Sequence, residues 1–278
     1  MFGTAVWPVI DFGLSGIPMQ AQKMAGKLSI SGVQPKLILQ LNTEKNQLET
    51  MPGGDYILKP QTDRFLNIPE NEQCCMDIAD VLGIDTPVHC LLPLQDKSLA
   101  YVIKRFDRLN GEKIHQEDFS QLLGEDDKYK GSVERISRKI KEISTAPGYD
   151  LQLLFERVAL NFIVANADAH LKNYTMRYLG DERRLSPVYD VVCSRLAIPE
   201  EKEESAITIN GKRNNLTRAD FDALAVYLQT PLTVGYRIFE NKFGTIKGII
   251  EKSKLPQEDK TTFMKIVEER LNRLTIAL

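Results

Sequence analysis

The chain has 278 residues, of which 42% are hydrophobic and 27% are charged. This apolar content is enough for a packed core, so a chain that is disordered throughout is excluded. The 36 Lys and Arg residues nearly balance the 38 Asp and Glu residues, which gives a net charge of −2. Binding of nucleic acid through phosphate attraction needs a basic face, so we expect no direct nucleic-acid binding.

The cysteines and the apolar segments bear on the cellular compartment. Four cysteines are present, at positions 74, 75, 90 and 193, and none has the spacing of a zinc site. We expect them to be buried free thiols, which suit a reducing cytoplasm. The first ten residues have no positively charged start, and no run of 18 apolar residues exists. The sequence therefore predicts a cytoplasmic protein that has no membrane partner.

Strand patterns dominate the first part of the chain. The first 27 residues are rich in glycine, proline and small residues and predict an irregular arm. One helix is predicted over 72–82, where Gly83 ends it. Short apolar strands are predicted over 36–41, 56–59, 88–94 and 99–106.

Helical periodicity dominates from Glu117 onward. Residues 151–165 are apolar on almost every side, as in a helix buried at the centre of a lobe. A helix over 217–227 opens with the Thr-x-x-Asp pattern of a capping box, and 257–274 carries an apolar stripe. The acidic run at 200–204 predicts a solvated loop, with a substrate-facing activation segment as the alternative.

This change of pattern predicts an α+β fold of two lobes. We expect a sheet-rich N-lobe over 1–106 and a helical C-lobe over 107–278, with a hinge near 104–107. Arg105 and Arg108 are expected to form structural ion pairs near this hinge.

A polar cluster follows the most apolar predicted helix. Residues 166–173 read NADAHLKN, and Asp168 precedes Asn173 by five positions. Asp190 follows Asn173 by seventeen positions, beyond a predicted short hairpin. The catalytic Asp and the metal-binding Asn of a protein-kinase catalytic loop have the same five-residue spacing, and Tyr189-Asp190 stands for the kinase Asp-Phe.

Phosphoryl transfer explains why these residue types would gather. Asn173 and Asp190 would hold magnesium against the negative phosphoryl group, and Asp168 would accept the proton of an attacking hydroxyl. The alternative is structural: Asp168 caps the end of a helix and Asn173 occupies a left-handed turn.

Two segments of the first part are candidates for phosphate binding. Lys59 ends a predicted strand, as the phosphate-binding lysine of kinases does, and Glu72 is a possible partner for it. The alternative is an ordinary exposed lysine before Pro60. Residues 28–36 (LSISGVQPK) offer one glycine, two hydroxyls and a lysine before a strand, although no glycine-rich phosphate motif is present. An ordinary Ser-Gly turn is the alternative there.

The motifs together resemble those of HipA-type serine/threonine kinases, the toxins of bacterial toxin–antitoxin systems. The runs SISGVQPKL, ILKP, YVIKRFDR, HQEDF, NADAHLKN and SPVYD occur in the order of that family, over roughly residues 28–275. The chain resembles most the short HipT type, which lacks the N-terminal subdomain of HipA. In HipT systems a small separate protein supplies that subdomain.

The resemblance implies ATP and Mg²⁺ as cofactors, with Asp168 as the catalytic base and Asn173 and Asp190 as metal ligands. It also implies autophosphorylation at Ser29 and Ser31. The nucleotide contacts that it implies are Ser31, Gly32, Val33, Gln34, Pro35, Lys36, Lys59, Lys104, Arg105, Phe106, His170, Leu171, Lys172, Asn173, Tyr189 and Asp190.

The implied activity is transfer of the ATP γ-phosphate to a host protein and to the loop serines of the chain itself. The family resemblance points to an aminoacyl-tRNA synthetase of the tryptophanyl type as substrate, and to inhibition of translation and growth as the result. The implied partners are a small HipS-like subdomain protein and a HipB-like DNA-binding antitoxin. Two alternatives stay open: a catalytically silent antitoxin-binding module, and a small-molecule kinase of the same fold.

Overall fold

The computed structural model describes residues 1–25, 35–109 and 111–276. The chain divides into two compact units. Unit 1 consists of Met1–Gln73 and Pro87–Glu112, and unit 2 consists of Cys74–Thr86 and Lys113–Leu278. The division falls inside helix α2 (Ile68–Val81), so one continuous helix contributes residues to both units.

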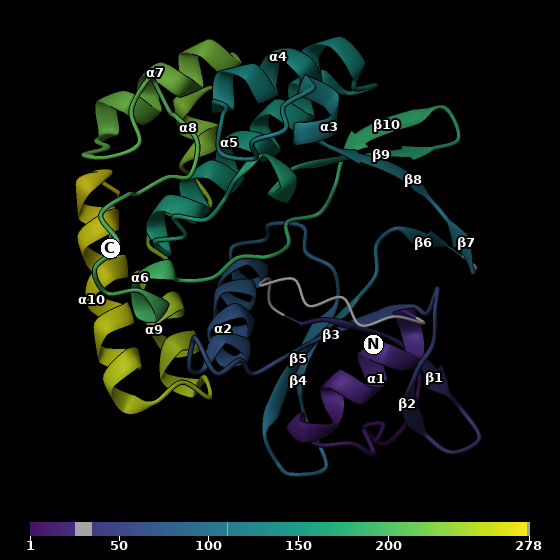
Figure 1. The fold of residues 1–278 in the computed structure, drawn as a ribbon. Coiled ribbons are helices and arrows are strands. Elements are labelled where there is room, and N and C mark those ends of the chain that lie inside the picture. The colour runs from purple at the N-terminus through teal and green to yellow at the C-terminus, as the bar shows by residue number, and fades with distance from the viewer. Residues whose placement is uncertain (26–34, 110, 277–278) are drawn as a thin grey trace. The chain divides into compact units, whose positions relative to one another are not determined.

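A five-stranded antiparallel sheet is the framework of unit 1 (Figure 1). The four predicted strands are confirmed, and a further short strand, β2, was not predicted. The order across the sheet is β2-β1-β3-β5-β4. The bounds are β1 (Leu37–Asn42), β2 (Gln47–Thr50), β3 (Tyr56–Pro60), β4 (His89–Pro93) and β5 (Leu99–Lys104).

Alternate residues of these strands bury one face of the sheet. Leu37 and Leu39 of β1 lie in the same buried cluster as Leu58 of β3 and Val102 of β5. Side chains of successive strand residues point to opposite faces, so one apolar residue in two is enough to build this core. The burial of β3, which alternates between buried and half-buried positions, shows the pattern directly.

The prediction of an irregular N-terminal arm is wrong for residues 14–25. They form a short 3₁₀ helix, η1 (Leu14–Gly16), and helix α1 (Ile17–Ala25), which packs against β1 and β2 (Figure 1). Ile10, Phe12 and Ile17 join the core of the sheet. The helix was missed because so short a segment contains too few apolar residues to display a period.

Unit 2 is mainly helical, and α5 (Pro147–Ile163) lies at its centre, in contact with α4, α7, α8 and α10. Twelve of its 17 residues are buried, which confirms the predicted buried helix. The other helices are α3 (Phe119–Leu123), α4 (Val133–Ile143), α6 (Ser194–Ala197), α7 (Arg218–Leu228), α8 (Leu232–Gly235), α9 (Phe243–Lys252) and α10 (Gln257–Arg273).

Two small β elements complete the described chain. The three-stranded sheet of unit 2 has the order β10-β9-β8 and contains β8 (His115–Asp118), β9 (Thr175–Leu179) and β10 (Glu182–Leu185). The ribbon β6 (Arg108–Leu109) and β7 (Glu112–Lys113) lies where the chain leaves unit 1. The hairpin β9–β10 is the one predicted between Asn173 and Asp190.

Several local predictions are tested by these contacts. The capping box at the start of α7 is confirmed, with reciprocal bonds between Thr217 and Asp220. All four cysteines are free and buried, as expected. The prediction of a solvated acidic loop over 200–204 is wrong for Glu204. Its carboxylate lies 3.0 Å from Arg270 and 2.7 Å from Arg273 of α10. None of the helices in the described ranges is both long and apolar enough to cross a lipid bilayer.

Candidate functional site

The loop that carries the candidate catalytic residues begins where α5 ends. Ala165 has a left-handed backbone (φ 54°), which turns the chain sharply out of the helix. The Asn166 side chain then donates to Asn161 Oδ1 (2.9 Å) and accepts the Asp168 N–H (3.2 Å). This buried amide connects the loop to the last turns of α5. The backbone at Asp168 is therefore held in a fixed position relative to that helix.

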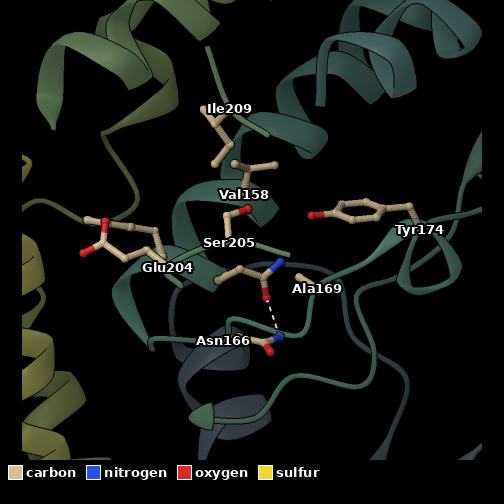
Figure 2. A pocket seen from close by; sticks show the side chains of 9 residues that line it. Val158, Asn166, Ala169, Tyr174, Glu204, Ser205 and Ile209 are labelled. Carbon is tan, nitrogen blue, oxygen red and sulfur yellow. Dashed lines mark hydrogen bonds between the residues drawn. The ribbon is translucent and has the colours of Figure 1, made fainter. Parts of the chain in front are cut away.

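Residues of this loop line a small cavity. Its volume is about 10 Å³, enough for one water molecule but not for a substrate. Figure 2 shows Asn166, Tyr174 and Ser205 among its lining residues, so the cavity is polar enough to hold that water. We assign this cavity to the scaffold of the loop.

Asn173 and Asp190, the predicted metal ligands, meet in unit 2. Asn173 lies in a 3₁₀ turn, η2 (Leu171–Asn173), and its side-chain nitrogen is 3.0 Å from Asp190 Oδ2. The hairpin β9–β10 separates the two residues in sequence and returns the chain to the loop. Asp190 has a left-handed backbone (φ 60°), whereas Asn173 is not in the left-handed turn of the structural alternative.

The donor set of this pair fits magnesium. Mg²⁺ prefers oxygen ligands at about 2.1 Å in octahedral geometry, so two adjacent ligand atoms lie about 3 Å apart. Asn173 Oδ1 accepts one hydrogen bond, from the His170 N–H, and an amide oxygen has a second lone pair for a cation. Binding would exchange the present amide N–H bond to Asp190 for coordination through that oxygen. Asn173 and Asp190 are therefore the residues that would hold the ion.

Asp168, on the same loop, is exposed, and Tyr129 is its partner. The Tyr129 hydroxyl donates to Asp168 Oδ1 at 2.9 Å. The backbone of Asp168 is also engaged, because its carbonyl accepts the His170 N–H at 2.8 Å. An exposed carboxylate with a fixed orientation is what a proton acceptor for a substrate hydroxyl requires.

His170 is buried and bonded to a lysine. Its Nε2 lies 2.7 Å from Lys128 Nζ. Burial lowers the pKa of His170, and the charge of Lys128 acts in the same direction, against the opposing charges of Asp168 and Asp190. The neutral imidazole that results accepts a hydrogen bond from Lys128.

Three other residues of this segment, Tyr189, Leu171 and Lys172, are predicted nucleotide contacts, and they differ in burial. The Tyr189 hydroxyl donates to the Lys172 carbonyl (2.8 Å) and contacts the Thr175 hydroxyl, so it joins the segment before Asp190 to the loop. Burial raises the pKa of Tyr189 to about 12. The Leu171 side chain is fully buried, whereas Lys172 is exposed.

The predicted phosphate-binding lysine lies in unit 1 and has the expected partner. Lys59, in β3, places its Nζ 2.7 Å from Glu72 Oε1. The Glu72 side chain, on α2, is 1% exposed. The Lys59 ammonium also lies 5.8 Å from the ring centre of Tyr101 on β5. Pairing of Lys59 with Glu72 is confirmed, and the alternative of an ordinary exposed lysine is wrong.

Removal of the Lys59 ammonium should destabilise unit 1 strongly. We expect Lys59→Met to lower the free energy of unfolding by about 3–5 kcal/mol, because it leaves the Glu72 carboxylate buried without its cation. The matched control is Lys45→Met, since the Lys45–Glu49 pair is exposed and such pairs contribute about 0–1 kcal/mol. Urea denaturation of both variants measures the difference. Equal losses of unfolding free energy in the two variants would show that the Lys59–Glu72 pair stabilises the fold no more than an exposed pair does.

The predicted hinge residues form an ion-pair cluster. Arg105 and Arg108 both bind the Asp107 carboxylate, at 2.7 and 2.9 Å, as expected. Burial alone would raise the pKa of Asp107, but the two arginines outweigh it and lower the pKa. Lys104 is exposed at the end of β5, and Phe106 is half-buried. The guanidinium of Arg105 is therefore already bonded to the Asp107 carboxylate.

The predicted phosphate loop falls largely beyond the described residues. Ser29, Ser31, Gly32, Val33 and Gln34 lie outside them. Pro35 and Lys36 are described, are exposed and lead directly into β1.

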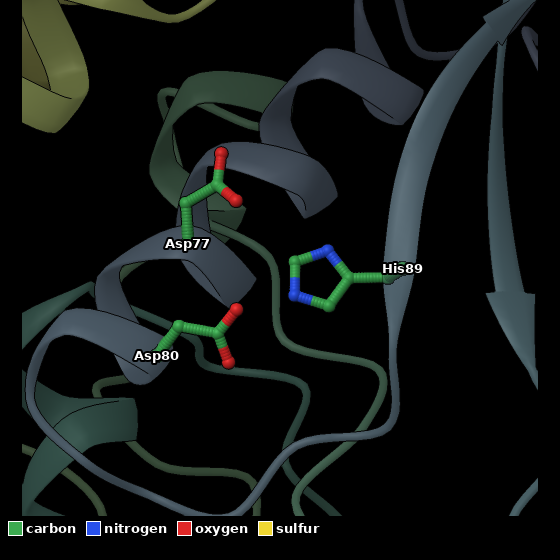
Figure 3. A group of neighbouring side chains, drawn as sticks. All are labelled: Asp77, Asp80 and His89. Atoms are coloured by element: carbon green, nitrogen blue, oxygen red, sulfur yellow. The ribbon is translucent and has the colours of Figure 1, made fainter. Parts of the chain in front are cut away.

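Figure 3 draws three further titratable side chains, Asp77 and Asp80 on α2 and His89 on β4. Asp80 accepts a bond from the Thr86 hydroxyl in unit 2. The His89 Nδ1 lies 3.3 Å from Gln73 Oε1 in unit 1. Each of these two contacts lies within one unit and stabilises the local fold.

Two solved structures have the same fold as this chain. HipA of Shewanella oneidensis, solved in a complex with HipB and its operator DNA, superimposes with a TM-score of 0.72 at 21% identity, over 90% of this chain and 66% of that chain. The proinflammatory kinase CtkA of Helicobacter pylori gives 0.63 at 15% identity, over 96% and 95%. The predicted α+β, kinase-like fold is confirmed.

The sequence relationships then define the family. The model of the HipA-like C-terminal domain matches residues 28–266, so the chain belongs to that family. A putative kinase of Sinorhizobium fredii, Y4dM, is 34% identical over 216 residues, which cover 70% of this chain and 51% of the relative. The serine/threonine-protein kinase toxin HipA of Shewanella oneidensis is 27% identical over 199 residues, covering 63% and 45%. The chain thus spans about half the length of these curated relatives.

Sequence reasoning missed Lys128 and Tyr129, the partners of His170 and Asp168. They lie about 40 residues before the loop that they contact, in a polar stretch without a recognisable motif. Only a long-range contact gives them a role, so no local pattern of the sequence could identify them.

Proposed function

We propose that the chain is an ATP-dependent serine/threonine-protein kinase and the toxin of a HipBST-type toxin–antitoxin system. The observation that carries the kinase activity in this proposal is the 3.0 Å contact of Asp190 with Asn173, which lies on the loop that also presents Asp168. Membership of a family whose relatives are named kinases supports it.

In the proposed reaction, the residues of unit 2 orient the substrates and move a proton. Magnesium and ATP, when bound, supply the phosphoryl group and offset its charge. Asp168 accepts the proton of the substrate hydroxyl as its oxygen bonds to the γ-phosphorus. Asn173 and Asp190 would hold the ion, and Tyr189 keeps the segment before Asp190 against the loop.

The residues of unit 1 bind the nucleotide. Lys59, oriented by Glu72, would contact the ATP phosphates. The proposed phosphate loop is Ser31 to Lys36, and the proposed adenine contacts are Lys104 to Phe106. Phosphate on Ser29 or Ser31 would repel ATP from that loop, which gives autophosphorylation a regulatory effect.

The partners and the substrate are inherited from the family resemblance. We propose a HipB-like DNA-binding antitoxin, a small HipS-like subdomain protein and an aminoacyl-tRNA synthetase substrate in the cytoplasm. The solved HipA neighbour is itself in a complex with HipB and DNA, which supports the first of these.

Radiolabelling identifies the class of substrate. We expect purified protein with γ-³²P-ATP and bacterial lysate to label a protein band, and phosphoserine or phosphothreonine to appear on acid hydrolysis. Mass spectrometry of the host proteome after expression should then find a heavily phosphorylated aminoacyl-tRNA synthetase. Label only in solvent-extractable molecules would indicate a small-molecule kinase, and no label would indicate a silent binding module.

A further inference from the structure

A segment before α4 packs directly on the candidate catalytic loop. The Lys128 carbonyl accepts the Leu171 N–H at 3.0 Å, and Lys128 Nζ reaches His170. At Gly131 a Cβ atom would lie only 2.7 Å from the end of the Leu171 side chain, so a larger residue there would force Leu171 to shift. Backbone and side-chain contacts together fix residues 128–131 against the loop.

Tyr129 is held on several sides within this segment. Its hydroxyl donates to Asp168 Oδ1 at 2.9 Å, and its ring meets that of His170 edge to face, with centroids 5.4 Å apart. The Lys128 ammonium lies 4.9 Å from the Tyr129 ring centre. Arg213, 84 positions further along the chain, donates to the Tyr129 carbonyl. The ring contacts therefore hold the hydroxyl beside Asp168, and Arg213 holds the main chain of the segment.

We propose that Tyr129 is a positioning residue that orients the Asp168 carboxylate for proton acceptance. Its hydroxyl occupies Oδ1 and fixes the plane of the carboxylate. In the part of the chain that the structure describes, no donor bonds to Oδ2, which leaves this oxygen for the substrate. This inference rests on the proposed kinase function.

In the proposed phosphoryl transfer, Asp168 Oδ2 accepts the proton of the substrate hydroxyl. The substrate O–H bond breaks, its proton goes to Asp168 Oδ2, and the substrate oxygen forms a bond to the γ-phosphorus of ATP. The bond between that phosphorus and the β–γ bridging oxygen breaks, and ADP leaves. Tyr129 neither gains nor loses a proton.

The opposite reading is that the Tyr129 hydroxyl competes with the substrate hydroxyl for Asp168. Two observations favour positioning. The Tyr129 ring packs edge to face on His170 and lies beside the Lys128 ammonium, so a rotation of the side chain away from Asp168 would break these contacts as well. The Tyr129 hydroxyl bonds to Oδ1, so a substrate hydroxyl can bond to Oδ2 without displacing the tyrosine.

The test compares Tyr129→Phe with Tyr149→Phe in steady-state phosphoryl transfer. Phenylalanine keeps the ring contacts of Tyr129 and removes only the hydroxyl. Tyr149, on α5, is 56% exposed and serves as the control for loss of a tyrosine hydroxyl. Melting temperatures equal to that of the unmodified protein establish that both variants are folded.

We expect Tyr129→Phe to lower kcat by about tenfold to a hundredfold with KM for ATP unchanged, because a charge-assisted bond that orients the base is lost. Tyr149→Phe should match the unmodified protein in both constants. An unchanged or faster kcat in Tyr129→Phe would overturn positioning, as would a loss that appears only in KM. If the unmodified protein transfers no phosphate, the proposed function fails first and this inference falls with it.

Discussion

Replacement of Asp168 by alanine is expected to lower kcat for phosphoryl transfer by about 10²- to 10⁴-fold. The side chain is exposed on a loop whose backbone is fixed by Asn166, so its removal should change chemistry and leave the fold intact. ADP release, followed in a coupled assay at saturating ATP, measures the effect.

The control for this change is Asp181→Ala. Asp181 is an exposed aspartate in the turn of the hairpin β9–β10, in the same unit. It should leave kcat unaltered. Turnover retained in Asp168→Ala would mean that another group accepts the proton.

Replacement of Asp190 by asparagine should remove the charge of the proposed metal site while keeping its shape. The new amide oxygen can still accept the Asn173 N–H that Asp190 Oδ2 accepts now. Loss of an anionic ligand removes several kcal/mol of charge stabilisation, so we expect transfer to fall about a hundredfold or more. Titration with magnesium at fixed ATP should show a much weaker dependence on the ion.

The same Asp181 serves as a control in the form Asp181→Asn. Asp181→Asn removes the same charge as Asp190→Asn, but at a position away from the Asn173–Asp190 pair. This variant should keep the full dependence on magnesium. If Asp190→Asn also keeps that response, the ion is held elsewhere.

The parts of the site that the sequence predicted are those with fixed local spacing. The kinase-like order of Asn173, a short hairpin and Asp190 predicts this pair, and the hairpin β9–β10 is present between them. Lys59 was identified because the lysine ends an apolar strand, and its partner Glu72 because the next helix follows closely.

The parts that it missed depend on the tertiary fold. Strand β2 contains a single fully buried side chain, Leu48, so its sequence has no visible alternation. Tyr129 reaches Asp168 across 39 positions, a contact that no local rule could indicate. Glu204 reads as part of a solvated acidic run until α10 brings Arg270 and Arg273 beside it.

The central claim is that Asn173 and Asp190 hold the ion that serves phosphoryl transfer at Asp168. The most direct measurement is single-turnover transfer of label from γ-³²P-ATP to protein, with magnesium and with excess chelator, by the unmodified chain and by Asp190→Asn. We predict rapid labelling only by the unmodified chain with magnesium. Labelling by Asp190→Asn at the unmodified rate would contradict this account.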